Sequence, residues 1–142
     1  FSEIVNIESI VSFQENITIS DVDAMTGISF EKYINYILIQ NGFQTELEHP
    51  TQELRADITG WKNNKKYIFE LKLLRKNQIS HKDLEQLLAF TQIKDIEKVI
   101  FITNSIIPEK LIPLDKKLIV IGREQLRTIL KNKTVLLDIL KA

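Results

Sequence analysis

The stretch RADITGWKNNKKYIFELK, residues 55–72, decides the fold that the sequence predicts. Residues with strand-forming side chains lie on both sides of the pair Asn63 and Asn64. Asparagine tolerates the positive φ that a two-residue hairpin turn requires. The stretch therefore predicts a β-hairpin, with one strand over residues 56–61 and the other over residues 66–74.

Charged side chains occupy positions on this hairpin where a packed sheet would carry apolar ones. A two-residue turn sets a register in which Asp57 faces Glu70. Directly opposed residues share one face of the sheet, with Cβ atoms about 4.5–5.5 Å apart. Strand alternation places Lys72 on the same face as Glu70. We therefore expect two carboxylates and one ammonium group to converge.

Two like charges in direct opposition destabilise a sheet, so this pair requires neutralisation. Lys72 supplies part of it, and a divalent cation supplies more, because carboxylate oxygens suit Mg²⁺ or Mn²⁺. A metal ion held by Asp57 and Glu70 can polarise a phosphate and activate water. A neighbouring lysine can orient that water or stabilise the developing charge. The competing interpretation is an acid pair on the solvent side of the hairpin, although the apolar neighbours of Glu70 indicate a strand buried on both faces.

A third carboxylate precedes the hairpin. Thr26 predicts the start of a helix that runs to about residue 41, where Gly42 stops it. Within this helix Glu31 lies about 90° from the centre of the apolar face, at its edge. It would face the hairpin from there, or else it is an ordinary exposed glutamate.

The remaining patterns complete an α/β domain. Ser80 predicts the cap of a second helix, over residues 82–94. The other expected elements are strands over residues 43–48, 98–103 and 117–121, a helical turn over residues 108–111, and a last helix over residues 124–130. Residues 135–140 could add a helical turn or more. This order predicts a mixed β-sheet flanked by helices on both sides.

Composition places few limits beyond these. A chain of 142 residues with 44% hydrophobic and 27% charged residues is ordinary for one soluble domain. No apolar run reaches the length of a membrane span, and no signal peptide is recognisable, so no membrane partner is expected. The absence of cysteine fits a cytoplasmic, intracellular protein. Because the chain begins with Phe1, we expect a piece of a larger multidomain protein, with residues 1–25 as an N-terminal arm or linker and residues 26–142 as the domain.

Charge is unevenly distributed although the net charge is zero. Residues 1–25 contain five acidic residues and no Lys or Arg, whereas residues 62–76 contain six basic residues and one acidic residue. A basic patch around a buried carboxylate fits a polyanionic partner, and a solvated turn is the alternative.

Glu31, Asp57, Glu70 and Lys72 together resemble the PD-(D/E)xK nuclease superfamily, in which a helix Glu precedes a strand Asp and then Glu-x-Lys on the next strand. The opening TGISFE followed by NGF is most similar to Mrr-type restriction endonucleases, and the later IFELK followed by HKDLEQLLAF is similar to archaeal Holliday junction resolvases. The resemblance covers about residues 26–122.

The resemblance implies a Mg²⁺-dependent endodeoxyribonuclease, with Mn²⁺ able to substitute. Asp57, Glu70 and the backbone carbonyl of Leu71 would bind the metal ion. Lys72 would assist the attacking water, and Glu31 would bind a second metal ion or a metal-bound water. The expected partners are DNA and a second copy of the chain, in a homodimer.

Other residues are expected to support the site or to contact DNA. Gln86 matches a position in the following helix that often steadies the active site or touches DNA. Four basic residues of the hairpin region complete the expected contacts: Lys62, Lys65, Arg75 and Lys76.

Three alternatives stay open at this point. A junction resolvase would prefer four-way junctions to linear duplex. A non-catalytic module on the same fold would bind nucleic acid or protein without cutting. An unrelated α/β domain would carry the hairpin charges on its surface.

Overall fold

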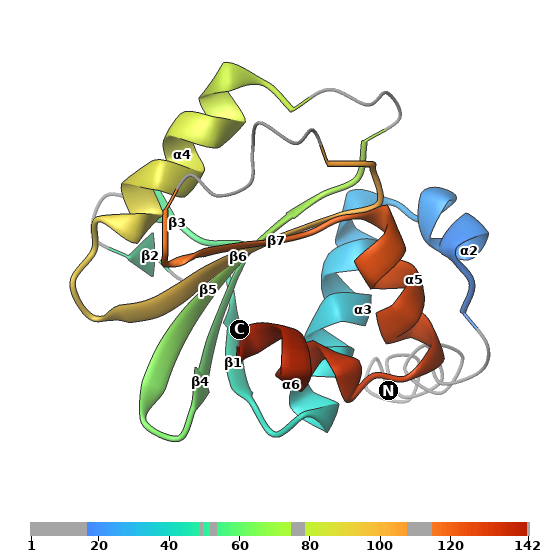
Figure 1. Ribbon diagram of the computed structural model, residues 1–142, viewed down its shortest axis with the longest axis horizontal. Helices are drawn as coiled ribbons and strands as arrows, with labels where there is room; N and C mark the ends of the chain where they lie inside the picture. Colours follow the sequence, from blue (N-terminus) through green and yellow to red (C-terminus); the bar gives the residue numbers. More distant parts are fainter. Residues whose placement is uncertain (1–16, 49, 52–53, 75–78, 108–114, 142) are drawn as a thin grey trace, which may run out of the picture.

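A computed structural model describes residues 17–48, 50–51, 54–74, 79–107 and 115–141. The protein has a twisted five-stranded sheet with helices on both faces (Figure 1). The strands, in spatial order, are β1 (Gln44–Leu47), β4 (Ile58–Lys62), β5 (Lys65–Lys72), β6 (Ile96–Thr103) and β7 (Leu118–Ile121). Because β1, β4 and β5 pair antiparallel and β5, β6 and β7 pair parallel, the sheet is mixed, as predicted.

Helices cover the two faces unequally. One face carries α4 (His81–Thr91), which connects the parallel strands β5 and β6. The other face carries α3 (Gly27–Gln40), α5 (Arg123–Lys131) and α6 (Val135–Leu140) (Figure 1). A parallel pair requires a crossover connection, and α4 provides it. The predicted α/β class is confirmed.

The hairpin has the predicted register. Thr59 lies opposite Ile68, and Trp61 lies opposite Lys66. The turn residues Asn63 and Asn64 have φ of 53° and 63°. Two successive residues with positive φ are the signature of the primed turn whose twist matches that of the flanking strands.

Side-chain caps begin the helices where the sequence predicts them. The Thr26 hydroxyl accepts from the Ser29 N–H at 3.0 Å, and the Ser80 hydroxyl accepts from the Asp83 N–H at 3.1 Å. Each bond satisfies a backbone donor that has no partner inside the helix. Gly42, with φ of 89°, follows the end of α3 as expected.

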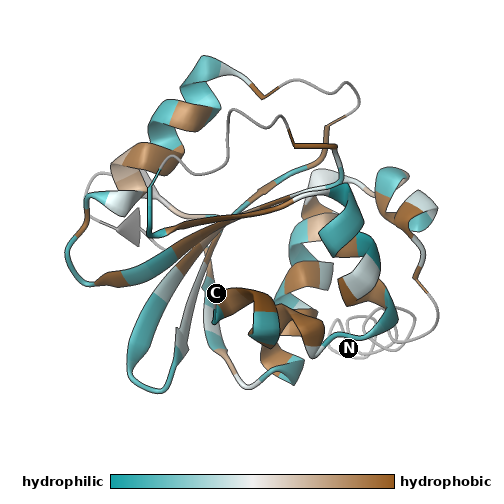
Figure 2. Cartoon of the chain, in the orientation of Figure 1, coloured by the Kyte–Doolittle hydropathy of each residue, from teal (hydrophilic) through white to brown (hydrophobic). Residues whose placement is uncertain are grey.

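The sheet is buried on both faces, as the apolar strands predict. Successive residues of β5 enter different clusters: Ile68 packs with Leu87 and Phe90 beneath α4, and Phe69 packs with Phe30 beneath α3. Figure 2 shows apolar residues along the central strands and alternating apolar and polar residues along the flanking helices. Phe90 is fully buried.

A short helix, α2 (Ile19–Asp23), lies in the segment that was expected to be an N-terminal arm or linker. Ile19 and Val22 are buried in the cluster that contains α3 and α5. A capping box between Thr18 and Asp21 starts the helix. The expected domain boundary after residue 25 stays a prediction.

Two further features complete the chain. The strands β2 (Pro50–Thr51) and β3 (Leu54–Arg55) form a small separate sheet just before the hairpin. The turn expected over residues 108–111 lies outside the described residues. Among the helices that the structure describes, none is long and apolar enough to cross a membrane.

Candidate active site

Asp57 and Glu70 meet across the hairpin. Asp57 immediately precedes β4, and Glu70 lies near the end of β5. The Asp57 N–H donates to Glu70 Oε1 at 3.1 Å, and the Leu71 N–H donates to Asp57 Oδ2 at 2.8 Å. Each carboxylate therefore binds the backbone of the opposite strand, and this exchange fixes both side chains.

Burial and mutual repulsion perturb the two acids. Burial, followed by the charge of Asp57, raises the pKa of Glu70 to about 8. Burial also raises the pKa of Asp57, against the hydrogen bond from the Leu71 N–H, which lowers it. Perturbed carboxyl groups of this kind concentrate at functional sites, because stability alone gives no reason to bury two acids together.

Lys72 and Asp83 form an ion pair at the edge of the acid pair. Lys72 Nζ lies 3.4 Å from Asp83 Oδ1. Asp83 Oδ2 accepts from the Ser80 N–H at 3.3 Å, in the capping box of α4. Asp83 was absent from the predicted site residues. The signal was available, because an acid three residues after a capping serine lies on the first turn of the helix that follows the strand.

These groups line one cleft of about 230 Å³ between the sheet and α4. Gln86 lies one helical turn after Asp83 and lines the same cleft, as does the predicted ligand Leu71. The lining residues are Asp57, Glu70, Leu71, Lys72, Asp83, Gln86, Leu87 and Phe101. The structure therefore brings together five of the predicted site residues: Asp57, Glu70, Leu71, Lys72 and Gln86.

Glu31 approaches this cluster from α3. Burial raises the pKa of its carboxyl, and the charges of Asp57 and Glu48 raise it further. Glu31 thus lies within electrostatic range of Asp57 but does not line the cleft. In the part of the chain that the structure describes, no three His, Cys, Asp or Glu side chains are close enough to hold a metal ion together. The binding of a second metal ion or a metal-bound water by Glu31 therefore stays a prediction.

The donor set of the cleft fits one divalent cation. Asp57 and Glu70 offer carboxylate oxygens, and Leu71 offers a backbone carbonyl oxygen beside them. Hard oxygen ligands are those that Mg²⁺ and Mn²⁺ prefer, and Mg²⁺ keeps several water ligands when the protein supplies one or two carboxylates. A cation would also offset the repulsion that raises the pKa of Glu70.

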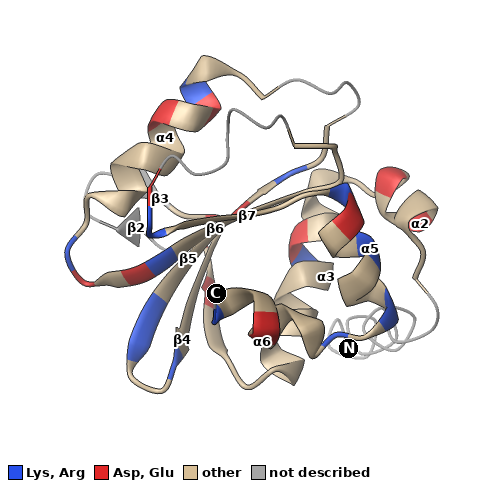
Figure 3. Ribbon diagram, in the orientation of Figure 1, with Lys and Arg blue, Asp and Glu red and all other residues tan. Residues whose placement is uncertain are grey.

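Lys62 and Lys65, two of the four predicted basic residues, lie away from this cleft. Figure 3 shows basic residues along the β4–β5 hairpin. Lys62 donates to the Asn41 carbonyl at the end of α3, and Lys65 lies 3.9 Å from Glu97. Lys62 is five residues along the strand from Asp57, roughly 16 Å away. Arg75 and Lys76 lie outside the described residues, so contacts of these four residues with DNA stay a prediction.

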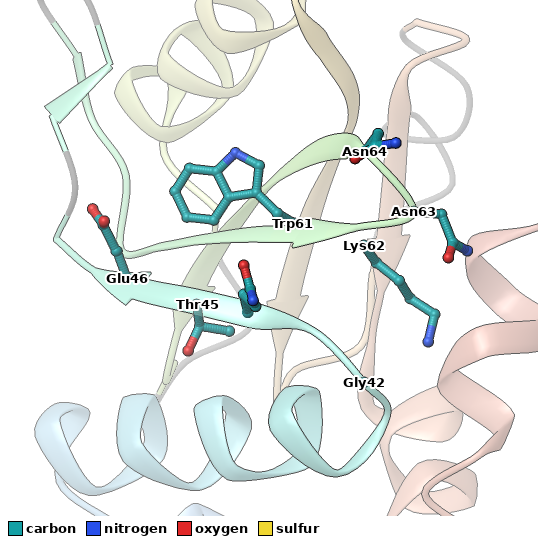
Figure 4. A pocket seen from close by; sticks show the side chains of 8 residues that line it. Gly42, Thr45, Glu46, Trp61, Lys62, Asn63 and Asn64 are labelled. Atoms are coloured by element: carbon teal, nitrogen blue, oxygen red, sulfur yellow. The ribbon is translucent and has the colours of Figure 1, made fainter.

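A larger hollow of about 850 Å³ lies at the hairpin turn rather than at the acid pair. Figure 4 shows Trp61 and Lys62 pointing to opposite sides of β4 in this hollow. A single carboxylate, that of Glu46, lines it. The smaller cleft instead joins the carboxylates of Asp57, Glu70 and Asp83 to the ammonium group of Lys72, and it is therefore the candidate active site.

A mixed sheet with helices on both faces, carrying an Asp before one strand and Glu-x-Lys on the next, defines a restriction-endonuclease-like fold of the PD-(D/E)xK superfamily. Residues 22–110 match the restriction endonuclease family Mrr_cat. The chain belongs to this family. The matched segment contains all of the site residues described above.

Two solved structures resemble part of the chain. The protein of unknown function AF1548 has 15% sequence identity and a TM-score of 0.47, with 63% of this chain and 54% of that chain covered. SPO1766, a protein of unknown function from Silicibacter pomeroyi, has 19% identity and a TM-score of 0.42, with 61% and 57% covered. The chain thus spans little more than half the length of these proteins. No curated protein matches its sequence significantly.

Proposed function

We propose that this protein is a Mg²⁺-dependent endonuclease that hydrolyses phosphodiester bonds of DNA. The observation that carries the proposal is the pairing of Asp57 with Glu70 in one cleft with Lys72. Membership of a restriction endonuclease family supports it. Neither a structural hairpin nor an ordinary surface patch accounts for two half-buried acids beside an ammonium group.

The residues of the cleft divide the work. Asp57, Glu70 and the Leu71 carbonyl would hold Mg²⁺ or Mn²⁺, which when bound supplies Lewis-acid activation of the phosphate and of water. The Lys72 ammonium would donate a hydrogen bond to the attacking water or to a phosphate oxygen, where negative charge develops. The Asp83 carboxylate, 3.4 Å from Lys72, restrains that ammonium at the mouth of the cleft.

Other details belong to the same proposal. Gln86 offers an amide donor on the α4 side of the cleft, where a phosphate oxygen of DNA would lie. Glu31 would hold a water molecule or a second ion at the α3 side. Two copies of the chain would act together, because a cut through both strands of a duplex needs two sites.

The test is nicking of supercoiled plasmid by the wild type, Asp57→Asn and Lys72→Ala, with Mg²⁺ or Mn²⁺ at fixed ionic strength. We expect metal-dependent nicking by the wild type and a loss of about 100-fold or more in each variant. Lys131→Ala removes the same charge as Lys72→Ala from the exposed last turn of α5, and it should cut at the wild-type rate.

Two outcomes would change the conclusion. A wild type that binds DNA but never cuts with either metal ion would identify a binding module on this fold. Faster cleavage of four-way junctions than of linear duplex would identify a resolvase. Both comparisons require matched salt, because the affinity of a protein for DNA depends steeply on ionic strength.

A further inference from the structure

A buried asparagine, Asn104, binds the backbone just after β5, the strand that carries Glu70 and Lys72. Asn104 follows β6, and only 5% of its surface is exposed. The Leu74 N–H donates to Asn104 Oδ1 at 2.8 Å, and Asn104 Nδ2 donates to the Leu74 carbonyl at 3.2 Å. One side-chain amide thus pairs with both backbone polar groups of Leu74, two residues beyond the end of β5.

Two charged residues from opposite ends of the chain hold Asn104 in turn. Asn104 Nδ2 also donates to Asp23 Oδ1 at 2.9 Å, and Arg123 donates to the Asn104 carbonyl at 3.0 Å. The Arg123 guanidinium donates to both carboxylate oxygens of Asp23, each at 2.9 Å. Bidentate pairing of this kind fixes orientation as well as distance. We call Asp23, Asn104 and Arg123 the clamp.

The clamp completes a pair of anchors around Lys72. On one side, the Leu71 N–H donates to Asp57 Oδ2. On the other side, Asn104 binds Leu74. Lys72 therefore lies between Leu71 and Leu74, and a side chain from elsewhere in the fold binds the backbone of each. The first anchor belongs to the candidate site, and the second belongs to the clamp.

We infer that the clamp positions the proposed active site, holding the backbone beside Lys72 so that its ammonium keeps its place relative to Asp57. The inference rests on the proposed function and deepens it. No clamp residue lines the cleft, so these are positioning residues rather than catalytic ones. A displacement of about 1 Å at a catalytic group can lower the reaction rate by about 100-fold. Loss of an anchor that prevents such a displacement is therefore expected to lower the rate.

The location of the clamp supports this role over simple packing. Arg123 lies outside the segment that matches the family, and Asp23 lies at its very start. Their hydrogen bonds converge on Asn104, and Asn104 in turn binds the backbone of Leu74, two residues after Lys72. Loss of Asn104 leaves the N–H and carbonyl of Leu74 without their side-chain partner, and loss of Asp23 or Arg123 removes one of the bonds that hold Asn104 in place.

The test compares Asn104→Ala and Asp23→Ala with Asp21→Ala. Asp21 lies two residues before Asp23 on α2 and caps that helix through Thr18 without joining the clamp. Asp21→Ala therefore removes an α2 acid and weakens the helix, but it leaves the clamp intact. Asp23 is partly exposed, so Asp23→Ala keeps the test usable should Asn104→Ala fail to fold.

Four readouts are measured: amide hydrogen exchange of Leu74 in the metal-free protein, Mn²⁺ affinity by calorimetry, the single-turnover nicking rate, and KM for DNA from steady-state nicking. In the clamp variants we expect exchange about tenfold faster, Mn²⁺ affinity and nicking about tenfold lower, and KM for DNA within about twofold of the wild type. Asp21→Ala should leave all four readouts within about twofold. Amide hydrogen exchange in β6 reports global unfolding, and its rate should stay at the wild-type value when the exchange of Leu74 becomes faster.

Equal readouts in Asp23→Ala and Asp21→Ala would overturn the inference, whatever their stability. Hydrogen exchange needs neither metal nor DNA, so the two proposals fail separately. A wild type that never cuts overturns the nuclease proposal. Hydrogen exchange of Leu74 and the affinity for Mn²⁺ then still decide whether the clamp positions the site. A wild type that cuts, with clamp variants at the wild-type rate, overturns the clamp alone.

Discussion

Glu70 shows the conflict between stability and function at a single carboxyl group. Burial and the charge of Asp57 raise its pKa from 4.5 to about 8. Between these two values the folded metal-free protein keeps a proton that the unfolded chain releases. The stability contributed by this proton is therefore full below about pH 4.5 and is lost as the pH rises through about 8.

Glu70→Gln should stabilise the metal-free protein at pH 8 and abolish metal-dependent nicking. Glutamine keeps the Oε1 atom that accepts from the Asp57 N–H, but it cannot ionise. We expect a gain on the order of a few kcal/mol at pH 8 that shrinks toward pH 5, measured by urea unfolding with a chelator present. An equal difference in unfolding free energy at both pH values would contradict the argument.

The residues of the acid pair could be predicted from sequence, whereas the clamp could not. The turn at Asn63 and Asn64 sets the register, and the register alone places Asp57 opposite Glu70. Asn104 gives no such signal, because its partners Leu74, Asp23 and Arg123 lie 30, 81 and 19 residues away. Separations of this kind follow from the tertiary fold rather than from any local pattern.

At the scale of the element, α4 combines two tasks at its first turn. Ser80 and Asp83 form the capping box that starts the helix, and Asp83 also pairs with Lys72. The first turn of α4 is thereby bonded to Lys72 of the candidate active site. The cap could be predicted from the sequence, but the second task depends on where β5 places Lys72.

Asp83→Asn and Ser80→Ala should separate these tasks. Asparagine retains an acceptor for the Ser80 N–H but loses the charge that restrains Lys72. Ser80→Ala removes the hydroxyl cap and should lower the unfolding free energy by about 1 kcal/mol, with the nicking rate unchanged. Asp83→Asn should lower nicking about tenfold with a smaller loss of stability. Equal nicking rates in the two variants would show that Asp83 serves the helix alone.

The helix α2 was missed because its stability comes from tertiary contacts. Five residues are too few for a helix to form by itself in water. Burial of Ile19 and Val22 and the ion pair of Asp23 with Arg123 supply what the local sequence lacks. By contrast, α3 and the hairpin carry their own caps, turn residues and periodicity, so the sequence predicted both.

At the scale of the whole molecule, one ion pair joins the two ends of the described chain. Asp23 and Arg123 are 100 residues apart in sequence, and their pairing connects α2 to α5 beside the end of β6. The hydrogen bonds from Arg123 lower the pKa of Asp23 below its ordinary value of 3.8, with burial opposing them and with Asn104 and the charge of Arg127 adding smaller effects. A lowered carboxyl pKa stabilises the fold above the unfolded value, and this contribution disappears as the pH falls through the folded value.

Asp23→Asn should therefore weaken the fold at pH 7 but not in strong acid. The Asp23 side chain is 37% exposed, so solvent screening limits the expected loss to about 0.5–1 kcal/mol at pH 7. The difference from the wild type should vanish as the pH falls well below 3.8, because the wild-type carboxyl is then neutral as well. Urea unfolding across this range measures it, with Glu85→Gln on the exposed side of α4 as the charge-matched control. A loss that persists unchanged in acid would mean that shape and hydrogen bonding, rather than charge, join the two ends of the chain.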